Sequence, residues 1–104
     1  MEKQVLDDKL MLTLQDRLVA SRVEQLVEKA HDFLDAIDNG VSTVVLDLKG
    51  VSDVDSRGVT FVVGLYKETQ RRNKGFKVIG ANEDVYWLFN LMKLNEVFDV
   101  EKAG

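Results

Sequence analysis

The sequence contains no cysteine and no proline, and it has a single histidine, His31. The lack of cysteine excludes disulfide bonds, thiolate catalysis and cysteine-ligated metal sites, and nothing indicates an oxidising compartment. With no proline and only seven glycines, no stretch has the composition of a flexible or polyproline linker. His31 lies on the outer flank of an expected helix, so we expect it at the surface rather than in a catalytic or metal site.

Long hydrophobic runs are also missing. No apolar segment approaches the ~20 residues that a membrane-spanning helix needs, and Met1 is followed by polar residues rather than by a signal sequence. The 18 acidic and 14 basic side chains are mixed along the chain and give a net charge of −4. This argues against general binding to nucleic acids or anionic membranes. We therefore expect a cytoplasmic protein with no membrane and no direct nucleic-acid partner.

The residues that are present suffice for one domain. The chain has 104 residues, of which 45% are hydrophobic, so it is long enough to bury a core and too short for two domains. Residues 1–104 are expected to form a single domain.

The apolar pattern predicts strands alternating with helices. Two short strands at 3–6 and 10–14 are expected to form a hairpin, and a helix over 21–38 follows, begun by a capping box of Ser21 and Glu24. The later elements are a strand at 41–48, a helix at about 56–73, a strand at 76–80, a helix capped by Asn82 with an inward face of Val85, Leu88, Phe89 and Met92, and a closing strand at 97–100. This order predicts an α/β fold whose inner strands are parallel and joined by right-handed crossovers.

The helix at 56–73 needs an argument, because residues 59–65 have the composition of a strand. They run without a turn signal into a polar stretch, which favours one helix with Asp55 or Ser56 at its N-cap and Gly75 just past its end. Its inward residues are expected to be Val59, Val62, Val63 and Tyr66.

Polar residues gather between this central strand and this helix, at 47–58. Sites in open α/β sheets favour such strand ends. A serine at a helix N-terminus is exposed and can carry a phosphate that the helix dipole stabilises, so Ser56 is a sensible phosphoacceptor. The plainer alternative is that Asp55 and Ser56 only cap the helix.

Two other kinds of site have weaker support in the sequence than phosphorylation of Ser56. Asp47, Asp53 and Asp55 could hold Mg²⁺ around an aspartyl phosphate, as in a receiver domain, but such a domain needs more βα units than this chain shows. We favour a turn with solvated carboxylates, and we expect no metal and no cofactor. A basic run could contact phosphates, but cations at a helix end are favoured anyway; its members are Lys67, Arg71, Arg72, Lys74 and Lys77.

Tyr86 and Trp87 lie off the apolar stripe of the third helix. One is expected to complete the core, and the other is a candidate surface anchor for a partner.

The stretch Val44–Gly58 resembles the STAS domain family, specifically its stand-alone bacterial anti-sigma factor antagonists. The motif is an apolar strand ending in Asp-Leu, a few residues, and then Asp-Ser-Ser-Gly opening a helix. The likeness extends over nearly the whole chain, to the helix entry at 17–26 and the closing segment at 88–100. It implies a mixed sheet with parallel inner strands and about three to four helices packed mainly on one face.

The resemblance also implies a function without catalysis. The family's motif serine falls on Ser56, and the unphosphorylated form is expected to bind an anti-sigma factor that is also an ATP-dependent serine kinase. Phosphorylation ends this binding, and a PP2C-like phosphatase restores it. The docking surface is expected to surround Ser56 and to include Asp53, Asp55, Arg57 and Gly58.

Three positions depart from the family pattern. Arg57 replaces the second serine, Asp16 stands where glycine is common, and Val19 stands where aspartate is frequent. These departures leave open a partner-switching pathway that controls secretion or motility without a sigma factor, and a ligand-sensing module of the same fold.

Overall fold

Five strands form one sheet, and each strand lies beside its neighbours in the sequence. In the computed structural model, which describes residues 1–104, the sheet order is β1-β2-β3-β4-β5. β1 is antiparallel to β2, and every other neighbouring pair is parallel. The strands are β1 Glu2–Leu6, β2 Lys9–Leu18, β3 Thr43–Val54, β4 Gly75–Ala81 and β5 Asp99–Lys102.

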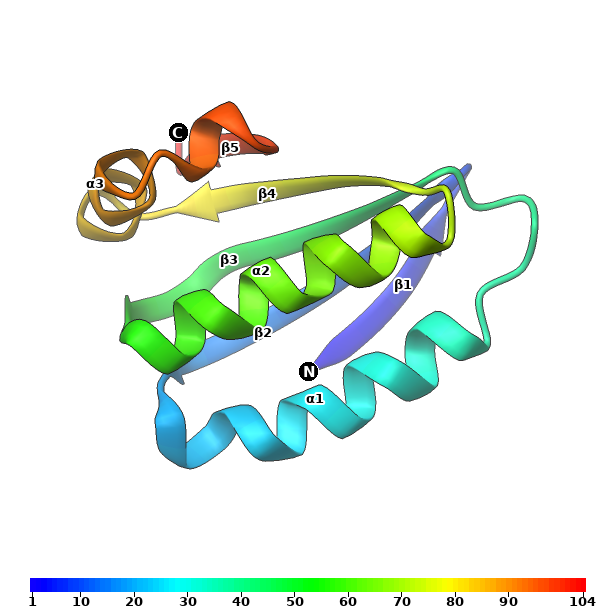
Figure 1. Ribbon diagram of the computed structural model, residues 1–104, viewed down its shortest axis with the longest axis horizontal. Helices are drawn as coiled ribbons and strands as arrows, with labels where there is room; N and C mark the ends of the chain where they lie inside the picture. The colour runs from blue at the N-terminus through cyan, green and yellow to red at the C-terminus, as the bar shows by residue number, and fades with distance from the viewer.

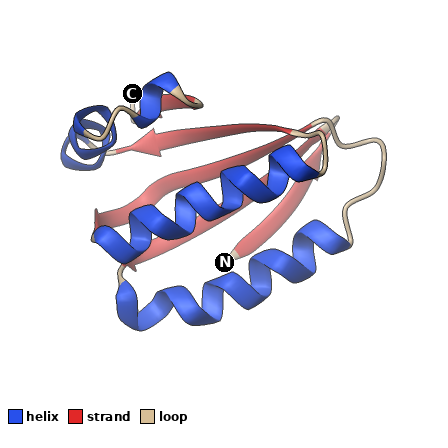
Figure 2. Ribbon diagram, viewed as in Figure 1, coloured by secondary structure: helices blue, strands red, loops and turns tan.

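Three helices connect the parallel strands. They are α1 Ala20–Asp35, α2 Ser56–Arg71 and α3 Glu83–Leu91, and a short 3-10 turn, η1 Leu94–Glu96, leads into β5. Every crossover steps to the next strand in the same direction, so right-handed connections place all the helices on one face. α1 and α2 lie side by side across that face in Figures 1 and 2. The predicted α/β fold, with parallel inner strands and helices mainly on one face, is confirmed.

The core lies between the sheet and this helical layer. Alternate strand residues face the helices, as the two-residue period of a strand requires, and α3 contributes Val85 and Phe89 to the same cluster as α1 and α2. The strand residues of this face are Leu10, Leu12, Leu14, Val44, Leu46, Leu48, Phe76 and Val78, all buried.

The helix boundaries correct part of the prediction. α1 begins at Ala20, so Ser21 is already helical and the capping box with Glu24 is wrong; α1 also ends at Asp35 rather than at residue 38. The predicted N-caps of the other two helices are confirmed, because Asp55 accepts from the Gly58 amide and Asn82 accepts from the Val85 amide. The predicted end of α2 is wrong: the helix ends at Arg71, the left-handed residue after it is Asn73, and Gly75 already begins β4.

Inward faces also differ from the predicted stripes. Met92 is the C-cap of α3 and is exposed, so it does not extend the buried stripe of that helix. Phe61 and Leu65 of α2 are buried in addition to Val59 and Val62. α2 packs on two neighbours, the sheet and α1. A sequence pattern that assumes one buried face per helix predicts the contact with only one of them.

The largest correction concerns β3, which runs to Val54 rather than ending near residue 48. Its second half pairs with the end of β2 through two register shifts, one of them beside Asp16. Asp16 has φ 69°, a left-handed conformation that glycine adopts freely and that aspartate tolerates. The polar stretch that follows residue 48 is therefore strand, and it carries the sheet up to the start of α2.

Candidate functional site

The candidate site is the turn from β3 into α2. β3 ends at Val54, Asp55 is the N-cap in extended conformation, and Ser56 is the first residue of α2. The Asp55 Oδ1 accepts from the Gly58 amide at 2.9 Å, so one of the free N–H groups in the first turn of the helix, that of its third residue, is satisfied. Ser56 is exposed, and its hydroxyl makes no hydrogen bond in the structure. The structure therefore displays a free hydroxyl where the helix begins.

Asp55 also caps a second helix. Its Oδ2 accepts from the Ala20 amide, the first N–H group of α1, at 3.0 Å, and its own amide donates to the Leu18 carbonyl at 3.2 Å. Val19, the N-cap of α1, has no capping side chain, and it stands where the family resemblance leads one to expect aspartate. One carboxylate thus fixes the starts of α1 and α2 relative to each other.

This shared cap predicts an acid-sensitive fold. Hydrogen bonds from the Gly58 and Ala20 amides lower the pKa of Asp55 below the ordinary value of an aspartate. A carboxyl group whose pKa is depressed by folding contributes stability above its unfolded pKa, and this stability is lost as the pH falls through the folded pKa. We expect the urea concentration at the unfolding midpoint to fall as the pH is lowered from about 5 to about 2, where carboxylates titrate. The fall should be smaller in Asp55→Asn.

Asp55→Asn is the informative variant because asparagine keeps one carbonyl oxygen for the Gly58 amide and has no second oxygen for the Ala20 amide. At pH 7 it should be less stable than the parent protein. Equal stability of the two proteins at pH 7 would contradict the shared cap. Asp84→Asn, an exposed aspartate in the first turn of α3, is the matched control.

Gly58 holds the helix against the end of β2. It is buried, and a Cβ built on it would lie 2.1 Å from the Leu18 carbonyl oxygen and 2.8 Å from Val54 Cγ1. Only glycine lets the two backbones approach this closely. Because Gly58 is buried, its part in a docking surface is to hold the turn in place rather than to offer a side chain.

An ion pair lies beside the serine. Arg17 Nε donates to Asp53 Oδ1 at 2.9 Å and to Oδ2 at 3.2 Å, and this contact raises the pKa of Arg17. Sequence reasoning found Asp53 but not Arg17, because their pairing depends on the register of β2 against β3. Arg57 is exposed and makes neither an ion pair nor a side-chain hydrogen bond. The neighbourhood of Ser56 thus holds two engaged carboxylates and one free cation.

The structure does not bring together the residues that the other chemistries considered above would need. Asp47 accepts from the Lys49 amide at 2.9 Å, and no group of three or more His, Cys, Asp or Glu side chains is placed to hold a metal ion. His31 is exposed, as predicted. Tyr86 packs partly against the core, whereas Trp87 is 64% exposed.

The basic run is largely occupied by partners within the protein. Arg71 and Arg72 contact Glu68, Arg72 also contacts Asp35, and Lys77 pairs with Glu101. Lys74 donates to the Val41 carbonyl. These pairs leave little of the run free for phosphates.

None of the helices combines the length and the apolar composition of a membrane-spanning segment.

Comparison with known proteins decides the family. The model of the STAS domain matches residues 1–103. The chain belongs to the STAS domain family. Among solved structures, the Thermotoga maritima protein TM1081, a candidate anti-sigma factor antagonist, superposes with a TM-score of 0.86 at 20% identity, covering 97% of this chain and 85% of that one.

Other members of the STAS family share the fold in different settings. The phosphorylated form of the Bacillus cell fate determinant SpoIIAA gives a TM-score of 0.70 at 19% identity, covering 95% of this chain and 88% of that chain. The STAS domain of a SulP transporter from Vibrio cholerae gives a TM-score of 0.75 at 14% identity, covering 96% of this chain and 77% of that chain. At such identities the likeness establishes the fold, and the function has to be argued from the site.

Proposed function

We propose that this STAS protein is an anti-sigma factor antagonist that is switched at Ser56. The unphosphorylated form binds an anti-sigma factor that is also an ATP-dependent serine kinase, and it thereby releases the sigma factor. The kinase then phosphorylates Ser56 and binding ends, until a PP2C-like phosphatase removes the phosphate. The domain itself performs no catalysis. The observation that carries this proposal is the exposed, unbonded hydroxyl of Ser56 at the first position of α2.

The electrostatics of the turn explain how one phosphate can act as a switch. A phosphate adds about −1.5 to −2 charges at neutral pH, here on a residue that follows Asp53 and Asp55 closely in the chain. The start of a helix tolerates such an anion, because the dipole and the free N–H groups favour it. The fold should therefore survive phosphorylation, whereas a partner surface fitted to a neutral serine would meet a new desolvated charge. Phosphorylation should therefore change partner binding without changing the fold.

The comparisons support the choice of this function among those of the family. SpoIIAA, one of the similar structures, is described as an anti-sigma factor antagonist and has been solved in both an unphosphorylated and a phosphorylated form. The present chain carries Ser56 in the stretch Asp55–Gly58, Asp-Ser-Arg-Gly, which resembles the family's Asp-Ser-Ser-Gly motif.

Phosphorylation with candidate kinases tests the proposal. Incubated with ATP and the kinases encoded beside its gene, the protein should gain one phosphate, and mass spectrometry of peptides should place it on Ser56. Ser56→Ala should not be phosphorylated but should still bind the kinase, because alanine is also neutral and small.

Two nearby hydroxyls provide the controls. Ser52 and Thr60 are also exposed, although the Thr60 hydroxyl already donates to the Ser56 carbonyl at 3.0 Å. Ser52→Ala and Thr60→Ala should be phosphorylated as fast as the parent protein. Phosphate on either of these residues in place of Ser56, or Ser56→Ala that no longer binds, would contradict the proposal.

A further inference from the structure

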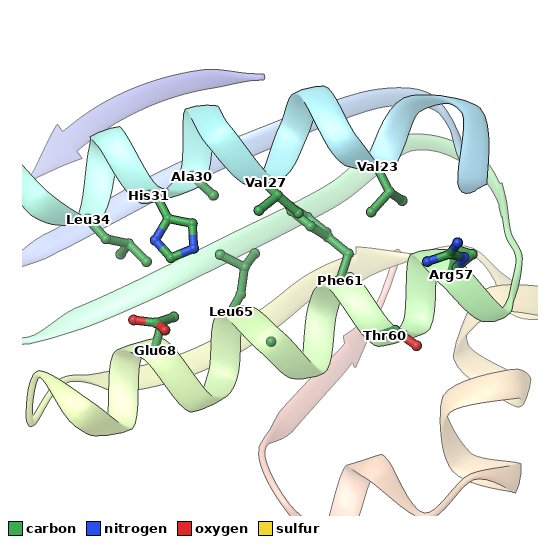
Figure 3. Close-up of a pocket in the computed structure, with 11 residues that line it drawn as sticks. Val23, Val27, Ala30, His31, Leu34, Arg57, Thr60, Phe61, Leu65 and Glu68 are labelled. Atoms are coloured by element: carbon green, nitrogen blue, oxygen red, sulfur yellow. The ribbon is translucent and has the colours of Figure 1, made fainter.

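A groove of about 300 Å³ runs between α1 and α2, and neither the family nor the phosphorylation site accounts for it. Figure 3 shows Val23, Val27 and Leu34 of α1 facing Phe61 and Leu65 of α2 across it. This volume is at the lower end of the range of small-molecule pockets, ~300 to 1,000 Å³. The groove is therefore large enough for a slender apolar ligand.

Gly64 keeps the groove open. It lies in the middle of α2, where glycine is unfavourable, and a Cβ built on it would meet nothing within 4 Å. The backbone therefore does not require glycine at this position, and any larger side chain would occupy space above the groove. This contrasts with Gly58 in the same helix, which the packing does require.

The charges at the two ends of the groove are unlike. At the far end, Glu68 accepts from Arg71 at 3.0 Å and from Arg72 at 2.6 Å, and Arg72 also contacts Asp35. Hydrogen bonding to Arg72 lowers the pKa of Glu68. That end of the groove therefore carries an ionised carboxylate, beside His31 (Figure 3), whose charge is balanced by the two arginines. At the near end Arg57 has no partner. An anion in the groove is thus attracted to Arg57 and not to the Glu68 end.

We propose that this groove binds a medium-chain fatty acid, with its carboxylate on the Arg57 guanidinium and its alkyl chain along Val27, Phe61 and Leu65. A planar guanidinium matches a carboxylate in bidentate geometry. The helix rise places Arg57 and Glu68 ~16 Å apart along α2, which is a suitable length for such a chain. The single free cation fits a monoanion, and the few polar groups of the lining do not fit the sugar and phosphates of a nucleotide.

The groove shares Arg57 with the docking surface expected around Ser56, but Ser56 itself does not line it. Ser56→Ala should bind the fatty acid as the parent protein does. Loss of phosphorylation and loss of ligand binding are therefore separable results.

Titration with decanoate below its micelle concentration, followed by NMR and calorimetry, tests the inference. Decanoate should bind and should shift the methyl and ring signals of Val27, Phe61 and Leu65. Decanol, which has the same chain and no charge, should bind about tenfold more weakly, as should decanoate to Arg57→Gln, because each change removes one charge-assisted contact. Lys67→Gln removes an exposed cation of α2 outside the groove and should leave the affinity unchanged.

Gly64→Leu tests the location. Because a side chain there points into open space, the variant should keep the circular dichroism spectrum of the parent protein and should no longer bind decanoate. Decanoate binding that Gly64→Leu leaves unchanged, equal affinity for decanol and decanoate, or binding only above the micelle concentration would each overturn the inference.

Discussion

Ser56→Asp should reduce the affinity for the partner kinase by at least about a hundredfold and leave the fold intact. An uncompensated charge buried in an interface costs roughly 3 to 5 kcal/mol, which corresponds to a loss of about a hundredfold or more. In the free protein the new carboxylate is at the first position of α2, where the helix dipole favours it. Arg17 is already paired with Asp53, so the free cation adjacent in the chain to the new carboxylate is Arg57.

Calorimetry with the purified kinase measures this effect. Ser56→Asn has nearly the same size as Ser56→Asp and no charge, so it should bind much more tightly than the aspartate variant. Circular dichroism and the thermal midpoint should be similar for both. If Ser56→Asp bound as tightly as the parent protein, the charge-based switch would be wrong; if both variants failed equally, the size of the side chain rather than its charge would be responsible.

Gly58→Ala should destabilise the protein by about 3 kcal/mol. The added Cβ would lie 2.1 Å from the Leu18 carbonyl oxygen and 3.0 Å from Leu18 Cγ. Backbone atoms cannot move aside as the end of a flexible side chain can, so the first turn of α2 would have to shift away from β2. That shift would also disturb the bonds that Asp55 makes to Gly58 and Ala20.

Gly64→Ala is the internal control, because it makes the same chemical change in the same helix. Its Cβ would meet nothing within 4 Å, and alanine is favoured over glycine in a helix by about 0.5 to 1 kcal/mol. This variant should be more stable than the parent protein in urea unfolding. If the two variants shifted the unfolding midpoint in the same direction, the role assigned to the close approach at Gly58 would be wrong.

The sequence predicts the elements that depend on local patterns. The caps at Asp55 and Asn82, the hairpin of β1 and β2, and α2 in place of a strand all follow from residues within a few positions of one another. The family resemblance adds the mixed sheet with its helices mainly on one face, and the position of Ser56. These are the parts of the fold and site that periodicity, capping chemistry and a motif can specify.

Contacts between distant segments could not be predicted. Asp55 caps α1 across 35 positions of sequence, and Arg17 meets Asp53 across 36, so neither contact has a local pattern. The extension of β3 to Val54 depends on the register shifts of β2, and the burial of Phe61 and Leu65 depends on α1 packing beside α2. Ser21 illustrates the converse error, since its sequence fits a capping box while a carboxylate from elsewhere in the chain caps the helix.

The order of strands along the sheet has a consequence for synthesis on the ribosome. Since each strand pairs only with those adjacent to it in the chain, no strand has to be inserted between two that already pair. β3 can join β2 as soon as α1 is made, and β4 and β5 then extend a growing edge. Such a topology keeps the sequence separation of its contacts short for a parallel sheet, which favours fast folding, and β5, the strand made after the other four, completes an edge rather than the centre.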